Sequence, residues 1–120
     1  MILKDNFFTI QSQNILENKA DFRVALDVEN FIYKAHFPNR PISPGVCLIQ
    51  MVVELFNTLQ GKNFSIKTLK NVKFTAPISP LEFPQIDVLL DFARNDNYYQ
   101  IKAIIKEKET VFAKISLILL

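Results

Sequence analysis

Glycine, tryptophan, cysteine and histidine are scarce in this chain of 120 residues. Two glycines and no tryptophan are present, which excludes the glycine-rich loops that hold nucleotide phosphates. A single cysteine, Cys47, excludes a disulfide framework and a cysteine-based metal site. A single histidine, His36, excludes the paired histidine ligands of a zinc enzyme. We therefore expect no bound metal.

Strong charge and long hydrophobic runs are also missing. The 14 basic and 12 acidic residues give a formal net charge of +2, which is too balanced for a general nucleic-acid binder. The N-terminus lacks the apolar run of a signal peptide. The longest apolar stretches, around 46–53 and 115–120, are too short to cross a membrane. We expect a soluble, cytoplasmic protein without a nucleic-acid or membrane partner.

The residues that are present can build a core. Hydrophobic residues make up 49% of the chain, and eleven residues are phenylalanine, which suits one domain over residues 1–120. Runs rich in apolar residues, several of them alternating with polar ones, predict strands on both sides of a central helix: near 8–12 and 22–28, then 64–75, 86–93, 98–106 and 111–119. This order predicts an α+β fold, with an antiparallel sheet curled around one helix.

The central helix has clear boundary signals. Ser43 is expected as its N-cap, Pro44 as its first residue and Gly61 as the residue past its end. Apolar side chains cover most of its circumference, so we expect it to be buried. Its polar exceptions fall on one narrow stripe: Gln50, Glu54 and Asn57. Six strands cannot cover every side of such a helix, so we expect a second copy of the chain to cover the open side.

Three prolines lie close together in residues 36–45, which read His-Phe-Pro-Asn-Arg-Pro-Ile-Ser-Pro-Gly. Proline at this density predicts a rigid loop. The loop begins with His36 and runs into the start of the helix, where the amides of Gly45 and Val46 have no partner within the helix. A neutral imidazole beside such amides suits removal of a proton next to a carbonyl, because the amides stabilise the developing oxyanion. The alternative is a purely structural histidine.

Residues 36–46 resemble the signature loop of the hotdog-fold 3-hydroxyacyl-[acyl-carrier-protein] dehydratases, which include FabZ and FabA. Residues 74–80, Phe-Thr-Ala-Pro-Ile-Ser-Pro, resemble the second proline turn of that family. The resemblance implies a six-stranded antiparallel sheet wrapped around one long helix. It also implies a homodimer, or a higher even oligomer, with two active sites at the interface between subunits.

The resemblance further implies dehydration of a 3-hydroxyacyl thioester on acyl carrier protein to the trans-2-enoyl thioester. His36 would be the base, and Phe37, Gly45 and Val46 would bind the substrate, with the amides of Gly45 and Val46 polarising the thioester carbonyl. The chemistry is proton transfer, so no cofactor is expected. The substrate is delivered by the carrier protein.

The sequence departs from the family at the position of the acid. The family has Glu or Asp fourteen residues after the histidine, and this chain has Gln50, with Glu54 one helical turn further on. An amide binds a hydroxyl group but cannot give it a proton. Three interpretations follow: Glu54 supplies the acid, a water held near Gln50 does so, or the dehydration is reduced or lost. The alternative functions are a hotdog acyl thioesterase and a non-catalytic acyl-binding or partner subunit.

Between Glu54 and Glu82 the sequence has no acidic residue but contains four lysines. A solvated strand face is one interpretation of this run. Because acyl carrier proteins are acidic, the other interpretation is docking of the carrier, and the candidate docking residues are Arg40, Lys62, Lys67, Lys70 and Lys73. Cys47 is interpreted as a small buried apolar residue, not as a nucleophile.

Overall fold

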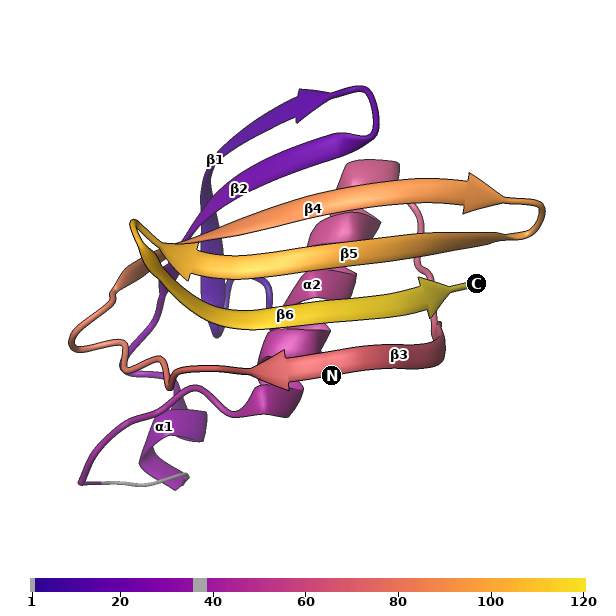
Figure 1. Ribbon diagram of the computed structural model, residues 1–120. Coiled ribbons are helices and arrows are strands. Elements are labelled where there is room, and N and C mark those ends of the chain that lie inside the picture. Colours follow the sequence, from indigo (N-terminus) through magenta and orange to yellow (C-terminus); the bar gives the residue numbers. More distant parts are fainter. Residues whose placement is uncertain (1, 36–38) are drawn as a thin grey trace.

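The computed structural model describes residues 2–35 and 39–120, and these residues form six strands and two helices. The strands are β1 (Phe8–Leu16), β2 (Lys19–Leu26), β3 (Ile66–Phe74), β4 (Gln85–Asn95), β5 (Tyr98–Glu107) and β6 (Thr110–Leu119), and the helices are α1 (Phe31–Ala35) and α2 (Gly45–Gln60). The strands form one sheet in the order β1-β2-β4-β5-β6-β3, and each neighbouring pair is antiparallel (Figure 1).

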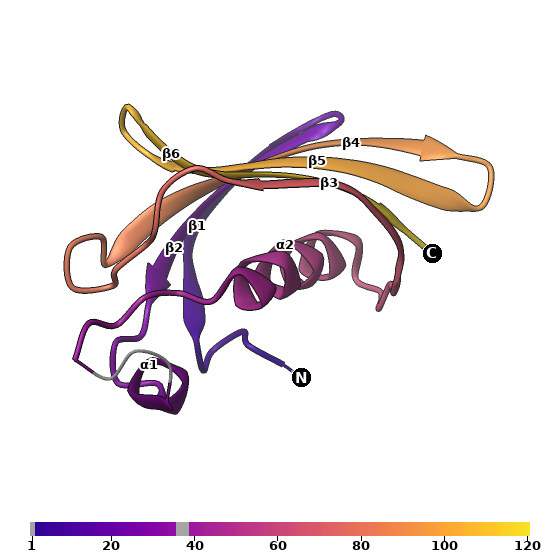
Figure 2. The same ribbon diagram turned by 60° about the horizontal axis from the view of Figure 1, so that its bottom comes forward.

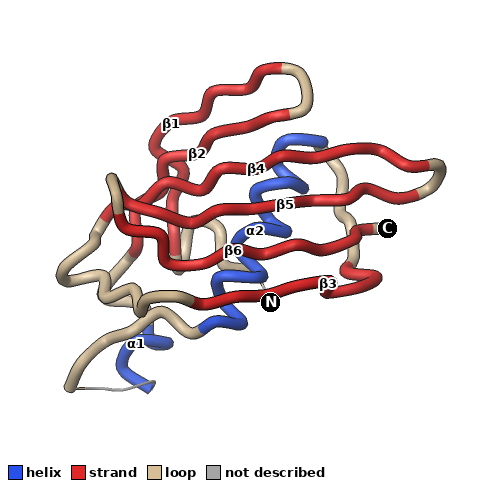
Figure 3. Tube along the Cα trace, viewed as in Figure 1, coloured by secondary structure: helices blue, strands red, loops and turns tan. Residues whose placement is uncertain are grey.

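The sheet arches over α2, and the core lies between them (Figure 2). Alternate residues of β2, β4, β5 and β6 are buried, because successive side chains of a strand point to opposite faces. They pack with the buried face of α2, where Met51, Val52, Leu55 and Phe56 are inaccessible to solvent. The expected α+β architecture is confirmed, and Figure 3 shows that the strands lie on one side of α2.

One boundary of α2 agrees with the expectation and the other does not. Gly61 follows the helix in the left-handed conformation at φ 67°, and its N–H donates to the carbonyl of Asn57, as glycine permits at this position. At the other end, Pro44 occupies the N-cap with no side-chain hydrogen bond to the first turn. The expectation of Ser43 as the N-cap was wrong, because the Ser43 hydroxyl is bonded to Tyr33.

Two segments that the sequence did not predict cover part of the side of α2 that faces away from the sheet. The N-terminal segment, residues 2–7, passes beneath α2 in Figure 2 and buries Leu3 and Phe7. The short helix α1 also lies on this side and buries Tyr33. The helix is still not covered all round, because Val46 in its first turn is 66% exposed. No helix in the described ranges is long and apolar enough to span a membrane.

Candidate functional site

The two proline segments meet at the start of α2. The backbone N–H of Ser43 donates to the carbonyl of Ile78 at 2.8 Å. The ring of Phe74 lies 2.7 Å from the point where a Cβ on Gly45 would stand, so only glycine leaves room for this ring. The space beside Gly45 is therefore filled by Phe74.

The first turn of α2 presents backbone donors. The amides of Cys47 and Leu48 donate to the carbonyl of Pro44 at 3.0 and 3.2 Å, so the hydrogen-bonded helix starts there. In the part of the chain that the structure describes, the amides of Gly45 and Val46 donate to no protein acceptor. Such a helix end attracts negative charge, because its N–H groups and the helix dipole point the same way.

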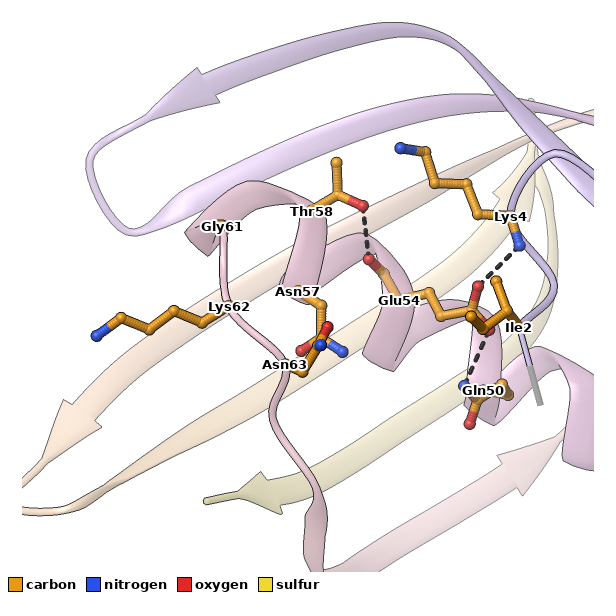
Figure 4. Close-up of a pocket in the computed structure, with 9 residues that line it drawn as sticks. All are labelled: Ile2, Lys4, Gln50, Glu54, Asn57, Thr58, Gly61, Lys62 and Asn63. Carbon is orange, nitrogen blue, oxygen red and sulfur yellow. Dashed lines mark hydrogen bonds between the residues drawn. The ribbon is translucent and has the colours of Figure 1, made fainter.

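Gln50 and Glu54 are in direct contact one helical turn apart (Figure 4). Nε2 of Gln50 donates to Oε2 of Glu54 at 2.9 Å. The backbone N–H of Leu3 lies 2.9 Å from both carboxylate oxygens, and that of Lys4 donates to Oε1 at 2.7 Å. Glu54 is 8% exposed, so it is a buried carboxylate that accepts hydrogen bonds through both oxygens.

This geometry gives Glu54 two tasks. It fastens the N-terminal segment to α2, since the amides of Leu3 and Lys4 have it as their acceptor. It also fixes the rotation of the Gln50 amide, because a carboxylate surrounded by N–H donors must face the nitrogen of Gln50 and not its oxygen. The sequence placed these two side chains on one stripe, but the contact with the N-terminal segment could not be predicted from that spacing.

A groove of about 450 Å³ runs along the polar stripe of α2. It is lined by Ile2, Lys4, Gln50, Glu54, Asn57, Thr58, Gly61, Lys62 and Asn63 (Figure 4). Asn57 is engaged at the end of the groove, where its Oδ1 accepts from the amide of Phe64 at 2.9 Å. Asn57 therefore holds the chain that leaves the helix.

The expected base lies outside the described residues. His36 and Phe37 fall between Ala35, the last residue of α1, and Asn39, where the description resumes. Cys47 is 3% exposed, and burial raises the pKa of its thiol, so the interpretation as a buried apolar residue is confirmed. Among the described residues, no group of three or more His, Cys, Asp or Glu side chains could hold a metal ion.

The candidate docking residues do not form one patch. Arg40 precedes α2 and Lys62 follows it, at opposite ends of a helix of 16 residues, which spans roughly 24 Å. On the edge strand β3, Lys67 lies over the ring of Tyr98 at 5.4 Å. Lys70 lines a depression of about 470 Å³ on the sheet, together with Lys102 and Lys114. The sequence interpretation missed the last two because they come from β5 and β6, and only the strand order brings them beside β3.

A family model for the ApeI-like proteins, described as ApeI dehydratase, matches residues 11–115. The chain is 28% identical over 91 residues to the 3-hydroxyacyl-[acyl-carrier-protein] dehydratase FabZ of Rhodospirillum rubrum, which covers 68% of this chain and 56% of that protein. It is 34% identical over 61 residues to FabZ of Rhizorhabdus wittichii, covering 43% and 38%. The chain thus spans about half the length, or less, of these curated relatives.

Solved structures share the fold. A chain of the dehydratase heterocomplex ApeI:P from Xenorhabdus doucetiae superposes with a TM-score of 0.73 at 18% identity, covering 92% of this chain and 95% of that one. The dehydratase domain from the CurK module of curacin polyketide synthase superposes with a TM-score of 0.56 at 14% identity, covering 92% and 41%. The sheet wrapped around α2 is therefore the hotdog fold.

Proposed function

Since the chain belongs to the ApeI-like dehydratase family, we propose that it removes water from a 3-hydroxyacyl thioester carried on acyl carrier protein. The C2–H and C3–O bonds break, a C2=C3 double bond forms, and the hydroxyl group leaves as water after taking up a proton. The product is the trans-2-enoyl thioester. The reaction is an elimination without net oxidation or reduction, so it needs no electron acceptor.

The uncapped start of α2 carries this proposal. The amides of Gly45 and Val46 have no acceptor among the described residues, and the Ser43 hydroxyl, which could have capped them, is bonded to Tyr33. They suit a thioester oxygen that becomes negative when the C2 proton leaves. His36 is the proposed base, because it is the single histidine and the proline loop that it begins leads directly to these amides. Phe37 is the proposed neighbour of the acyl group.

Gln50 is the proposed contact for the leaving hydroxyl, and a water in the groove is the proposed proton donor. Glu54 already accepts three N–H donors from Leu3, Lys4 and Gln50, so we assign it the orientation of Gln50 and not the acid role. A positioned general acid typically accelerates a reaction about 10²–10⁴-fold. We therefore expect this chain to be slower than a dehydratase that has a carboxyl group at position 50.

A second copy of the chain is the proposed neighbour of β3. This strand is the edge of the sheet beside β6, and apolar side chains on it are half exposed: Ile66 at 40%, Leu69 at 48% and Phe74 at 49%. An unpaired edge with apolar side chains favours pairing with another strand. Native mass spectrometry of the purified chain distinguishes a homodimer from a monomer that awaits a different subunit.

Carrier docking is proposed at Lys70, Lys102 and Lys114, which line one depression, with Lys73 opposite Lys114 in register. Arg40, Lys62 and Lys67 stay as secondary candidates. Two lysines directly opposite each other on neighbouring strands repel, and an acidic partner relieves this repulsion.

The function is tested by incubating the chain with a 3-hydroxyacyl thioester and with a crotonyl thioester. Enoyl formation and free thiol release are followed in parallel, for the natural sequence and for His36→Ala. Enoyl formation that His36→Ala abolishes supports dehydration. Thiol release without enoyl formation would make the protein a thioesterase and would overturn the proposal.

A second candidate function is that of a partner subunit with little activity of its own. It is favoured by one observation: position 50 holds an amide, and the nearby carboxylate of Glu54 is occupied by N–H donors. The ApeI:P dehydratase of Xenorhabdus doucetiae is described as a heterocomplex. This function would be favoured if neither enoyl product nor free thiol forms with the chain alone, and activity appears when a second dehydratase subunit is added.

A further inference from the structure

The N-terminal segment, residues 2–7, folds back on itself before it meets α2. The carbonyl of Leu3 accepts from the amides of Asn6 and Phe7 at 3.0 and 2.7 Å. Between them, Asp5 reverses the chain in the left-handed conformation, at φ 67°. The side chains of Leu3 and Phe7 are both buried. The segment is therefore a compact turn with two apolar anchors, and its backbone has a defined shape.

Contacts at both ends fasten this segment to the rest of the domain. At its C-terminal end, the ring of Phe7 stacks on Tyr33 of α1 with centroids 5.1 Å apart. The carbonyl of Asn6 accepts from Nδ2 of Asn30, which lies just before α1, at 3.0 Å. At its N-terminal end, the segment is fastened by the carboxylate of Glu54. The contacts with Asn30 and α1 hold the segment independently of Glu54, so the amides at its start lie beside that carboxylate in a fixed orientation.

Two successive amides at the start of the segment bind that carboxylate (Figure 4). The N–H of Leu3 lies 2.9 Å from both oxygens of Glu54, and the N–H of Lys4 donates to Oε1 at 2.7 Å. Successive backbone N–H groups in a turn form a concavity that binds an anion. The other oxygen, Oε2, faces Gln50, whose Nε2 donates to it at 2.9 Å. The segment thus sets the orientation of the carboxylate, and the carboxylate sets which end of the Gln50 amide faces it.

We propose that the backbone amides of Leu3 and Lys4 are positioning groups for Gln50, which they orient through Glu54. This inference rests on the proposed function of Gln50 as the contact for the leaving hydroxyl. The two ends of a planar amide point in different directions, so a nitrogen held on Glu54 turns the oxygen away from it. The substrate hydroxyl donates its hydrogen to that oxygen. Its own lone pairs are then left for the water that protonates it.

The alternative is that the N-terminal segment only completes the core. A double-mutant cycle with Gln50→Ala separates the two roles. Groups that act on the reaction through Gln50 have no further effect once its amide is removed, because residues in one hydrogen-bond network do not contribute independently. A segment with a purely structural role would instead change kcat by the same factor whether or not the Gln50 amide is present.

The kinetic test uses Lys4→Pro, because proline has no backbone N–H to donate to Glu54. Lys4→Ala is the reference, since it loses the same side chain and keeps the amide. We expect Lys4→Pro to have a kcat about fivefold below that of Lys4→Ala, with KM changed less than about twofold. In the Gln50→Ala background the two should have equal kcat, and a fivefold difference that persists there, at about its original size, would overturn the inference.

A second variant covers the case in which the proline ring prevents folding. An α-hydroxy acid at position 4 replaces the same N–H with an ester oxygen and adds no ring. The same loss in kcat is expected from this ester, again only while the Gln50 amide is present. A folded ester variant with the natural kcat would overturn the inference.

A further readout does not depend on activity. The side-chain NH₂ group of Gln50 gives a pair of signals in a nitrogen–proton NMR correlation spectrum, which are identified by their loss in Gln50→Ala. We expect these signals to move toward those of a solvent-exposed glutamine in Lys4→Pro and to keep their position in Lys4→Ala. Unchanged signals in folded Lys4→Pro overturn the inference even if the natural chain proves inactive. Moved signals with an inactive natural chain support the positioning of Gln50 and sink the proposed function alone.

Discussion

The amide nitrogen of Gln50 lies 2.9 Å from Oε2 of Glu54, so the residue at the position where the resemblance implies an acid is held by the carboxylate one turn further along α2. The same carboxylate binds the amides of Leu3 and Lys4. The amide side chain at position 50 is thus linked to a structural contact at position 54. The predictions that follow test each part of this arrangement.

Gln50→Glu is expected to create a pair of carboxyl groups that share a proton. Two carboxylates at this distance repel, so one of them takes a raised pKa and stays protonated near neutral pH. That proton supplies a general acid, and we expect dehydration to rise at least about tenfold. The gain should fade as pH rises through the raised pKa, because the pair then loses its proton.

The measurement for Gln50→Glu is the pH dependence of kcat, with Gln60→Glu as the control for a new acid on the same helix. Gln60 lies in the last turn of α2 and does not line the groove. Equal rates for Gln50→Glu and the natural chain at every pH would mean that position 50 does not contact the hydroxyl group.

Glu54→Ala is expected to lower the free energy of unfolding by about 2 kcal/mol or more, because the amides of Leu3 and Lys4 lose their acceptor. Amide hydrogen exchange at Leu3 and Lys4 should speed up as the N-terminal segment detaches. Glu82→Ala, at an exposed position, is the matched control and should change stability by less than about 0.5 kcal/mol. Urea unfolding measures both.

Glu54→Gln separates the anchoring role from an acid role. We expect a loss in kcat of less than about tenfold. A loss of about 10²–10⁴-fold in a variant of natural stability is the signature of a missing general acid, and it would contradict the assignment of Glu54 as the group that orients Gln50.

Gly45→Ala is expected to collide with the ring of Phe74, since the new Cβ would stand 2.7 Å from that ring. We expect a loss of about 1 kcal/mol in the free energy of unfolding. In a Phe74→Ala background the same change should be neutral or stabilising, because alanine is favoured over glycine in a helix. A double-mutant cycle by urea unfolding measures the coupling, and equal effects in both backgrounds would contradict the contact.

Lys102→Glu is expected to raise KM about fivefold or more for a carrier-bound substrate and to leave KM unchanged for a small pantetheine thioester. The effect should shrink with added salt, as docking between opposite charges does. Lys19→Glu is the control, at an exposed position at the start of β2. If both substrates respond alike to Lys102→Glu, the depression beside Lys70 and Lys114 is not the docking surface.

Local patterns in the sequence predicted most of this fold. The alternation of apolar and polar residues correctly predicted strands β2 and β6. Gly61 correctly marked the end of α2. Both features depend on residues that are neighbours in sequence. α1 was missed, because its five residues are too few for a helical period and it is held by contacts of Tyr33 with Phe7 and Ser43. Ser43 was wrongly predicted as the N-cap because a contact distant in sequence decides its role: its hydroxyl is hydrogen-bonded to Tyr33, ten positions away.

The sequence predicted which polar side chains of α2 share a face and not what those side chains contact. Helical spacing placed Gln50 and Glu54 on one stripe, and in the structure the two side chains are hydrogen-bonded. The amides of Leu3 and Lys4, some fifty residues away in sequence, complete the carboxylate's partners, and no local pattern reports such a contact. Lys70, Lys102 and Lys114 line one depression because of the strand order, which the sequence likewise does not report.

The central claim is that one imidazole removes a C2 proton while the start of α2 holds the thioester oxygen. It is tested most directly with a butyryl thioester in D₂O, because this substrate has no C3 hydroxyl and needs no acid. We predict that the natural chain and Gln50→Ala exchange C2 hydrogen for deuterium, and that His36→Ala does not. Exchange by His36→Ala at the natural rate would contradict the account.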